Sequence, residues 1–551
     1  MNYPIWELTT LGGGSLIALI AVLHVYISHL AVGGGLFIWL TDLKAYREKD
    51  KDLNGYVQKH SRFFLLLTMV FGGVTGVGIW FIIALVHPAA TSLLIHNFVF
   101  GWAIEWVFFL GEIVALLVYV YYFDRLERKH RLNVAFFYFL YAWLSLVVIN
   151  GILAFMLTPG DWLQTQNFWD GFFNPTYFPS LFFRTFMTML IAGLFGFVTS
   201  VFLADESFRM KMMRYCAKWL LFPLAGLVPS AWWYYAAIPQ SIQNTAFILN
   251  PQTNPVIILL VVTTILIFVI GIILSLRVAA GMQKALTFLL LLIGLGWMGG
   301  FEYSREIARK PFVISDVMYS TAIAKTDPVI TQQASLLMAA KWSSIKEITE
   351  KNKIEAGKEL FNLQCLGCHT LNGIRNDLVE QTKEFTYLGL LALLSGQGKV
   401  QTYMPPFAGT EQEKEALAGY LAALQDKDWK EEAETVITSD NSVEIPPYDF
   451  KNDEYILLVW NDKGMQFISD ADQWFSLMPP GNTLEALLIR RGEVPELVSE
   501  DVYLTYEVAS GYKNPSQQVK FWEYAQANFN QQPEKNVGLQ GKGLSGRFDF
   551  D

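Results

Sequence analysis

Eight apolar segments within the first 303 residues constrain the fold of this chain more than any other feature. Each is long enough to cross about 30 Å of hydrocarbon as a helix. Because lipid offers no hydrogen-bonding partner to the backbone, such segments are expected to span as helices. We therefore predict a mainly α fold with an eight-helix transmembrane bundle. The segments are 14–40, 63–86, 98–122, 133–157, 181–203, 215–238, 255–276 and 285–303.

The composition agrees with this division of the chain. Hydrophobic residues make up 53% of the 551 positions and charged residues only 17%, and the apolar excess lies in the first half. The net charge of -9, without a basic stripe, argues against a nucleic-acid partner. Residues 1–9 lack the basic region of a cleavable signal, so the first segment is expected to be retained.

Every second loop carries several Lys and Arg residues, and the loops between them carry none. The basic loops are 41–62, 124–132, 204–218 and 277–284. The loops without Lys or Arg are 87–97, 158–183 and 239–254. Basic loops stay on the cytoplasmic side of a membrane. We expect a protein of the bacterial inner membrane, with both termini on the periplasmic side.

The stretch LFNLQCLGCHTLNG, at residues 360–373, contains Cys365, Cys368 and His369 in the order Cys-x-x-Cys-His. This spacing is typical of c-type haem attachment. Two thiols can form thioethers with the haem vinyl groups, and the adjacent His can coordinate the iron. The third cysteine, Cys216, is expected alone in a short loop, so no disulfide framework is predicted. In bacteria haem c is attached outside the cytoplasm, which agrees with the topology inferred from loop charge.

Residues 350–425 resemble a class I cytochrome c. NKIEAGKELFNLQCLGCH predicts an amphipathic helix that leads into the motif, and TEQEKEALAGYLAAL predicts a closing helix. Between them, YMPPF offers Met404 as the second axial ligand. The resemblance implies an all-α domain, placed at 345–430, with one covalent haem c whose His/Met ligation raises its reduction potential. Such a haem transfers electrons and does not bind substrate.

Residues 440–551 contain the alternating runs EYILLVW and VYLTYEV, separated by turn residues. This pattern predicts a small β-rich domain on the periplasmic side. No catalytic constellation is visible in it. We expect it to pack against the cytochrome c or against a neighbouring subunit.

Ionisable side chains inside membrane spans are costly and are therefore functional candidates. The first span holds His24 and His29, and the third holds Glu105 and Glu112. The two glutamates, seven residues apart, share one face of a helix. The two histidines lie about 140° apart around theirs, so they cannot both serve one iron from the same side. One is then a ligand candidate, and the other can hydrogen-bond a neighbouring helix.

The order of motifs over residues 10–320 resembles subunit I of the cytochrome bd oxidases. His24 precedes a Gly-rich stretch, and FGGVTGVGIW, AIEW, FFLGE, YYFDRL, NGILAFMLTPG and REIARKPFVISDV follow in the family's order. The resemblance implies a bd-like membrane domain over 1–320. It also implies that His24 and Glu105 hold an oxygen-reducing haem and that Glu112 belongs to a proton path.

Other residues depart from the family pattern. Where the family has a His in the fifth span as ligand to the haem on the quinol side, this chain offers Met187, which is either a ligand or a core methionine. The loop that forms the quinol site is reduced to residues 239–254. The ligand Glu expected in the eighth span is not at its place, although Glu302 and Glu306 lie nearby. We expect the quinol entrance to be lost and the haem c to replace it.

Histidines outside the spans are weaker candidates. His87 and His96 lie at the outer ends of the second and third spans, and His96 is preferred as a haem ligand because it directly precedes the third span. His60, in a basic loop, is expected to be solvated.

Three functions fit the sequence. The first is a bd-like terminal oxidase subunit, in which electrons pass through the haem c to one or more b- or d-type haems that reduce oxygen. The second is a quinol dehydrogenase that passes electrons out through the haem c, and the third is a non-catalytic electron conduit. Each requires periplasmic redox partners, and the bd resemblance implies a second membrane subunit.

Overall fold

The computed structural model describes residues 5–250, 253–399, 402–425, 449, 452–461, 483–508 and 513–548. Its contacts divide the chain into two compact units, Met1–Lys427 and Asp428–Asp551. Each unit is described by itself.

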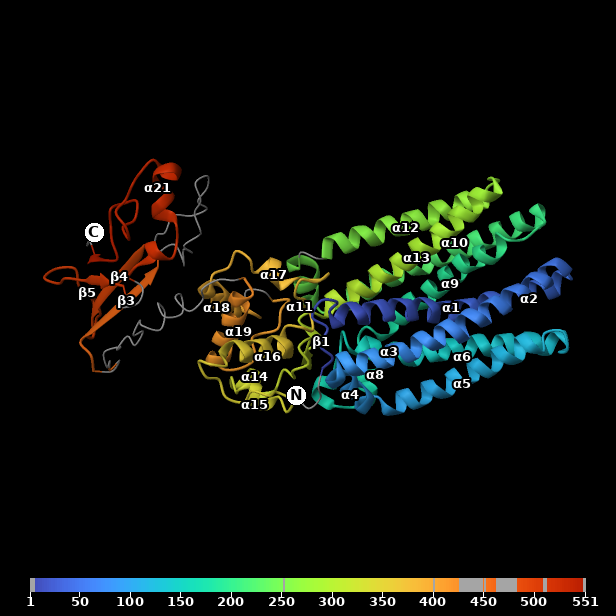
Figure 1. Ribbon diagram of the computed structural model, residues 1–551, viewed down its shortest axis with the longest axis horizontal. Coiled ribbons are helices and arrows are strands. Elements are labelled where there is room, and N and C mark those ends of the chain that lie inside the picture. The colour runs from blue at the N-terminus through green and yellow to red at the C-terminus, as the bar shows by residue number, and fades with distance from the viewer. Residues whose placement is uncertain are drawn as a thin grey trace. The chain divides into compact units, whose positions relative to one another are not determined.

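Eight long helical runs make up most of the first unit in the described part of the chain, and Figure 1 shows them side by side. We call them the helix bundle. The second run is continuous through a π-helix. The runs are α1 (Gly13–Glu48), α2 (Lys51–Leu65) with η1 (Leu66–Gly72) and α3 (Gly73–Val86), α5 (Val99–Tyr121), α6 (Arg128–Phe155), α9 (Tyr177–Ser200), α10 (Glu206–Ala237), α12 (Thr253–Ser275) and α13 (Ala280–Arg309).

The eight apolar segments are all helical, and this confirms the predicted fold class. Among the described residues, seven of the runs are long and apolar enough to cross a membrane. The run outside this set is α10, whose first turns are basic and which contains Pro223 and Pro229. It packs closely along α9, because a Cβ at Gly193 would lie 3.0 Å from the Leu220 and Trp219 side chains. The chain is an integral membrane protein.

The basic loop predicted at 204–218 is wrong, because α10 begins at Glu206. Cys216 is consequently not in a loop but fully buried inside this helix. Lys and Arg can extend their charged ends toward the membrane surface while their stems cover apolar neighbours, so a helix can begin among them. His60 is likewise not solvated: it is buried and hydrogen-bonds the Thr199 hydroxyl at 2.8 Å.

Short elements connect the long helices and follow the last of them. Helical connections are α4 (Pro88–Asn97), α7 (Trp162–Thr165), α8 (Phe168–Phe172), α11 (Gln240–Gln243) and the π-helix η2 (Asn244–Leu249). A hairpin of β1 (Phe312–Ile314) and β2 (Met318–Tyr319) follows α13, and then α14 (Pro328–Thr331) and α15 (Leu336–Ala339).

A small α-helical domain completes the first unit. It contains α16 (Lys353–Gln364), α17 (Leu378–Gln381), α18 (Tyr387–Gly396) and α19 (Glu411–Ala423). The two predicted helices are present, as α16 and α19. They cross closely at Gly357, where a Cβ would lie 2.1 Å from the Ala416 carbonyl oxygen. Phe361 and Tyr420 pack beside this crossing with ring centroids 5.9 Å apart, and a capping box at Thr410 starts α19.

The second unit contains small sheets, as predicted. An antiparallel sheet joins β3 (Tyr455–Asn461), β4 (Leu484–Arg490) and β5 (Glu496–Leu497), and a second pairs β6 (Thr505–Glu507) with β7 (Ser545–Arg547). A 3₁₀ turn η3 (Pro515–Gln517) and a helix α21 (Phe521–Phe529), which the strand pattern did not predict, lie between β6 and β7. The predicted boundaries at 320, 345, 430 and 440 stay predictions.

The glycine stretch of α1 allows a close helix contact that yields a test of the packing. A Cβ on Gly33 would lie 1.8 Å from the Thr188 carbonyl oxygen of α9, which is backbone and cannot move away cheaply. Gly33→Ala should therefore destabilise the bundle by about 1–3 kcal/mol. Gly73→Ala is the matched control, since no atom lies within 4 Å of its added methyl group. The measurement is the thermal midpoint in detergent, and equal midpoints would contradict this contact.

Candidate functional site

The Cys-x-x-Cys-His motif forms a compact turn at the end of α16. The His369 amide donates to the Cys365 carbonyl at 3.0 Å, and neither cysteine of the motif is in a disulfide bond. The His369 Nδ1 hydrogen-bonds the Asn376 carbonyl at 3.0 Å, and the Asn376 amide donates to the Cys368 carbonyl at 3.1 Å. Burial lowers the pKa of His369, which favours the neutral ring. Its Nε2 then carries the lone pair that an iron would bind, and the Nδ1–carbonyl bond would orient the ring, as in known metal sites. These residues fit a covalent haem.

The segment that carries Met404 is tied to the same turn. Met404 is half-buried in the loop before α19. Four residues further on, the Ala408 amide donates to the side-chain oxygen of Gln364, the residue directly before Cys365, at 3.1 Å. Its role as an axial ligand stays a prediction that this arrangement supports.

The small α-helical domain is joined to the helix bundle at the end where α1 begins and α13 ends (Figure 1). The Leu371 amide donates to the Thr9 carbonyl at 2.8 Å. The Lys310 ammonium, just after α13, lies 3.3 Å from the Cys368 sulfur. The start of the first long helix and the end of the last are thus at one end of the bundle, as an even number of crossings requires.

A cavity of about 940 Å³ connects the haem motif to the interior of the bundle. This volume is at the upper end of the range of ligand pockets, so it suits a large prosthetic group. Gly367 and Cys368 line it from the motif turn. From the bundle, the four ionisable side chains predicted in the first and third spans line it. They are His24, His29, Glu105 and Glu112.

His24 lies on α1 against the second span. Its Nδ1 is 3.3 Å from the Thr75 hydroxyl. Gly76 provides space for the ring, because a Cβ there would lie 3.1 Å from the His24 Cε1. The π-helix η1 ends just before this contact, at Gly72, and π-helical turns often occur at functional sites. With Nδ1 beside Thr75, the Nε2 of His24 is the nitrogen that can bind iron.

The two glutamates of α5 have one neutral partner each. Glu105 accepts a hydrogen bond from Ser145 at 2.7 Å, and Glu112 contacts the Tyr138 hydroxyl at 3.1 Å. The Tyr138 hydroxyl is also 3.1 Å from the Ala31 carbonyl, which can only accept. The Tyr138 hydroxyl can donate to the Glu112 carboxylate and to this carbonyl, so its one proton is shared between two acceptors. Glu112 thus lines the cavity with a hydroxyl partner on α6.

His29 is engaged on both ring nitrogens. Nδ1 hydrogen-bonds the Val25 carbonyl at 2.8 Å, and Nε2 lies 3.2 Å from the Arg184 guanidinium on α9. Arg184 also donates to Glu302 at 3.0 Å, and Glu302 is paired with Arg305. Both histidines contact a neighbouring helix, but His29 has both ring nitrogens engaged, so His24 is the better ligand candidate.

The other two predicted ligands do not line the cavity. His96 is exposed on α4, and its Nδ1 bonds the Ser92 carbonyl at 2.7 Å. Met187 is fully buried in the hydrophobic core of the bundle. By contrast, His87 lines the cavity, although sequence reasoning ranked it below His96. The sequence signal available for His87 was its position directly after an apolar segment and before Pro88.

The cavity wall carries ionisable side chains that are spread along the helices. Among the described residues, no three His, Cys, Asp or Glu side chains gather as a bare metal ion would require. A haem iron is held by its porphyrin and needs only one or two axial side chains. His24 and Glu105 on the cavity wall suit the axial positions of a haem iron.

Comparison with known proteins identifies the small domain. Residues 352–421 match the family described as Cytochrome C oxidase, cbb3-type, subunit III. These residues form a cytochrome c domain. The match begins just before α16 and ends within α19, so it includes both crossed helices and the Cys-x-x-Cys-His turn. The protein is a membrane-bound electron-transfer haemoprotein with a covalent haem c.

The chain is also similar to one solved membrane oxidase, the bd oxidase from Geobacillus thermodenitrificans. The identity is 15% and the TM-score 0.47, over 54% of this chain and 86% of that one. No curated protein sequence matches this chain.

The position of Met404 beside the motif turn yields a test of axial ligation. Met404→Ala should leave the haem covalently attached but lower its reduction potential and open a coordination site, because only His369 would then hold the iron. The measurement is a redox titration of the purified protein, with binding of an added small ligand. Met338→Ala is the control, since Met338 is 62% exposed on α15. An unchanged titration of Met404→Ala would show that Met404 is not a ligand.

Proposed function

We propose that this protein is the catalytic subunit of a bd-like terminal oxidase that receives electrons through its cytochrome c domain and reduces oxygen inside the helix bundle. One observation carries the proposal: a single cavity is lined by Cys368 of the haem motif and by His24, Glu105 and Glu112 of the spans. Bound haems supply one-electron oxidation and reduction to such a site. The electron donor is a one-electron carrier, such as a reduced c-type cytochrome.

The side chains on the cavity wall suit the two requirements of oxygen reduction, a bound haem and a supply of protons. His24 and Glu105 are the residues that would hold a b- or d-type haem in the cavity. Reduction of oxygen to water consumes electrons and protons in equal number, so protons must reach the same place. Glu112 lies two helical turns, about 10 Å, further along α5 than Glu105, and its position on the cavity wall supports a role in carrying protons.

The proposal includes a second membrane subunit and redox partners on the periplasmic side of a bacterial inner membrane. Extensive apolar surface on the long helices supports a lipid and subunit environment. Trp106, Phe222 and Val77 are each at least 60% exposed in the isolated chain. In this topology the cytochrome c domain faces the periplasm, and the basic ends of the helices face the cytoplasm.

The ligand and the proton carrier should respond differently to mutation. His24→Ala should remove a membrane haem from the spectrum, because His29 is held by Arg184 and cannot replace it. Glu112→Gln keeps the size and hydrogen bonding but cannot carry a proton, so it should retain every haem and slow turnover by roughly 100-fold. The measurements are haem spectra and oxygen consumption with reduced cytochrome c and with quinol.

Wild-type protein should consume oxygen with reduced cytochrome c and not with quinol. If His24→Ala keeps every membrane haem and Glu112→Gln turns over at the full rate, the oxidase proposal is wrong. Electron flow from quinol to an external acceptor would instead favour the dehydrogenase alternative.

The topology can be tested on the full chain. A phosphatase reporter fused after Asp551 should be active, and a fluorescent reporter that matures only in the cytoplasm should be dark, because the cytochrome c domain and the start of α1 share one end of the bundle. The reversed pattern would exclude a periplasmic cytochrome c domain. A fusion within the Lys49–Lys51 turn, at the opposite end, is the matched control and should give the opposite result.

A further inference from the structure

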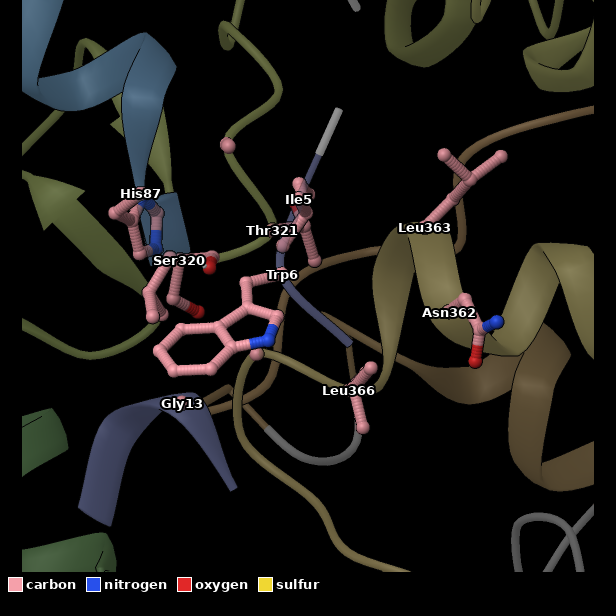
Figure 2. Close-up of a pocket in the computed structure, with 12 residues that line it drawn as sticks. Ile5, Trp6, Gly13, His87, Ser320, Thr321, Asn362, Leu363 and Leu366 are labelled. Atoms are coloured by element: carbon pink, nitrogen blue, oxygen red, sulfur yellow. Dashed lines mark hydrogen bonds between the residues drawn. The ribbon is translucent and has the colours of Figure 1, made fainter. Parts of the chain in front are cut away.

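His87 lies where the helix bundle meets the cytochrome c domain. It directly follows α3 and lines both the large cavity and a small pocket of about 20 Å³ at its outer end. Figure 2 shows it beside Ser320 and Trp6, with Leu366 of the haem motif across this pocket. His87 therefore lies between the haem c attachment turn and the interior of the bundle.

The two nitrogens of this imidazole differ. The Nε2 hydrogen-bonds the Ser320 carbonyl at 3.0 Å, which fixes the proton on that nitrogen, because a carbonyl can only accept. The Nδ1 is buried and has no hydrogen-bond partner. Burial lowers the pKa of His87, so the neutral ring is favoured and Nδ1 carries a free lone pair. A buried, unpartnered acceptor is costly unless a ligand satisfies it.

Two buried cationic donors at the same cavity also have no partner. They are the Nε groups of Arg309, at the end of α13, and of Arg375, from the cytochrome c domain. The Arg375 guanidinium lies over the Tyr303 ring, 5.5 Å from its centroid. A Cβ at Gly14 of α1 would lie 3.1 Å from the Arg375 Nη1. Arg375 is thus inserted between α1 and α13.

These side chains leave positive charge at the outer end of the cavity. Glu306 pairs with both Arg309 and Lys310, so this group of three carries one net positive charge. Arg375 adds a second. Guanidinium groups match the geometry of oxyanions such as carboxylates and form charge-assisted hydrogen bonds with them. The outer end of the cavity therefore offers one lone pair suited to a Lewis-acidic metal and an excess of two charges suited to two carboxylates.

A haem has this combination of groups, an iron and two propionate carboxylates. We propose that the outer end of the cavity binds a non-covalent haem, with His87 Nδ1 as an axial ligand and Arg309 and Arg375 as partners of its propionates. This haem is additional to the one assigned to His24. The proposal rests on the proposed function, because it assumes that the bundle holds haem.

The position explains what such a haem would contribute. Gly13, the first residue of α1, packs against Val86, the neighbour of His87. His24 lies eleven residues further along α1, about 16 Å deeper at 1.5 Å per residue. Because electron tunnelling becomes exponentially slower with distance, a centre at His87 would divide the path from the haem c to the His24 site into two shorter steps.

The test counts haem in the full-length protein purified in detergent. Pyridine haemochrome spectra before and after acid-acetone extraction give the ratio of non-covalent to covalent haem. His87→Gly should lower this ratio by one haem per chain and leave the haem c in place. Added imidazole should restore the lost haem, because it can occupy the space of the deleted ring. His96→Ala is the matched control and should keep the ratio.

The outcomes separate this proposal from the proposed function. An unchanged ratio of non-covalent to covalent haem in His87→Gly would overturn the His87 site. A changed spectrum of the haem c alone would also overturn it. In both cases the oxidase proposal would stand. Wild-type protein without any non-covalent haem would overturn both. If His87→Gly loses its haem c as well, the Arg375→Gln variant provides the test of the site, through the extraction of its non-covalent haem. Its haem c should stay attached while the non-covalent haem extracts more readily, and equal extraction from wild type and Arg375→Gln would refute the site.

Discussion

The carboxylate of Glu302 is the group on which the arrangement of the helix bundle depends. It accepts hydrogen bonds from Arg184 of α9 and Arg305 of α13, and Arg184 also contacts His29 of α1. Because these charges are removed from water, deleting one partner leaves the others uncompensated, at a typical cost of about 3–5 kcal/mol. The contact joins three helices at the cavity wall. It thereby fixes the position of α1, which carries His24 further toward the outer end.

Several contacts join the cytochrome c domain to the helix bundle. Lys310 and Ser320 contact Cys368, the Leu371 amide bonds the Thr9 carbonyl, and Arg375 enters between two long helices. Contacts from several directions hold the haem motif over the mouth of the cavity. The distance from the haem c to the buried side chains is therefore a property of the fold. Such a design suits an electron entrance that is always in place.

Much of this could be predicted from the sequence, because the dominant forces there are local. Hydrophobic length alone revealed eight helices, since lipid accepts few other structures. The Cys365–His369 spacing identified the haem motif because covalent attachment and axial ligation use residues that are close together in the chain. The predictions that failed concerned residues whose surroundings are set by contacts between segments distant in the chain. His87 and His96 are nine positions apart and look alike in sequence, yet only His87 faces the cavity. Arg131 was counted with a basic loop, but it is buried and paired with Asp42 at 2.6 Å.

The backbone bonds of the N-terminal segment have a consequence for how the protein is made. Residues 9 and 10 precede all eight long helices in the chain, but their partners, Leu371 and Ile374, follow them. A chain that is still being inserted cannot form this junction. The segment before α1 must therefore stay without these partners until the last long helix has been inserted and residues 371–374 have reached the same end of the bundle. Closure of the junction is then a late event in assembly.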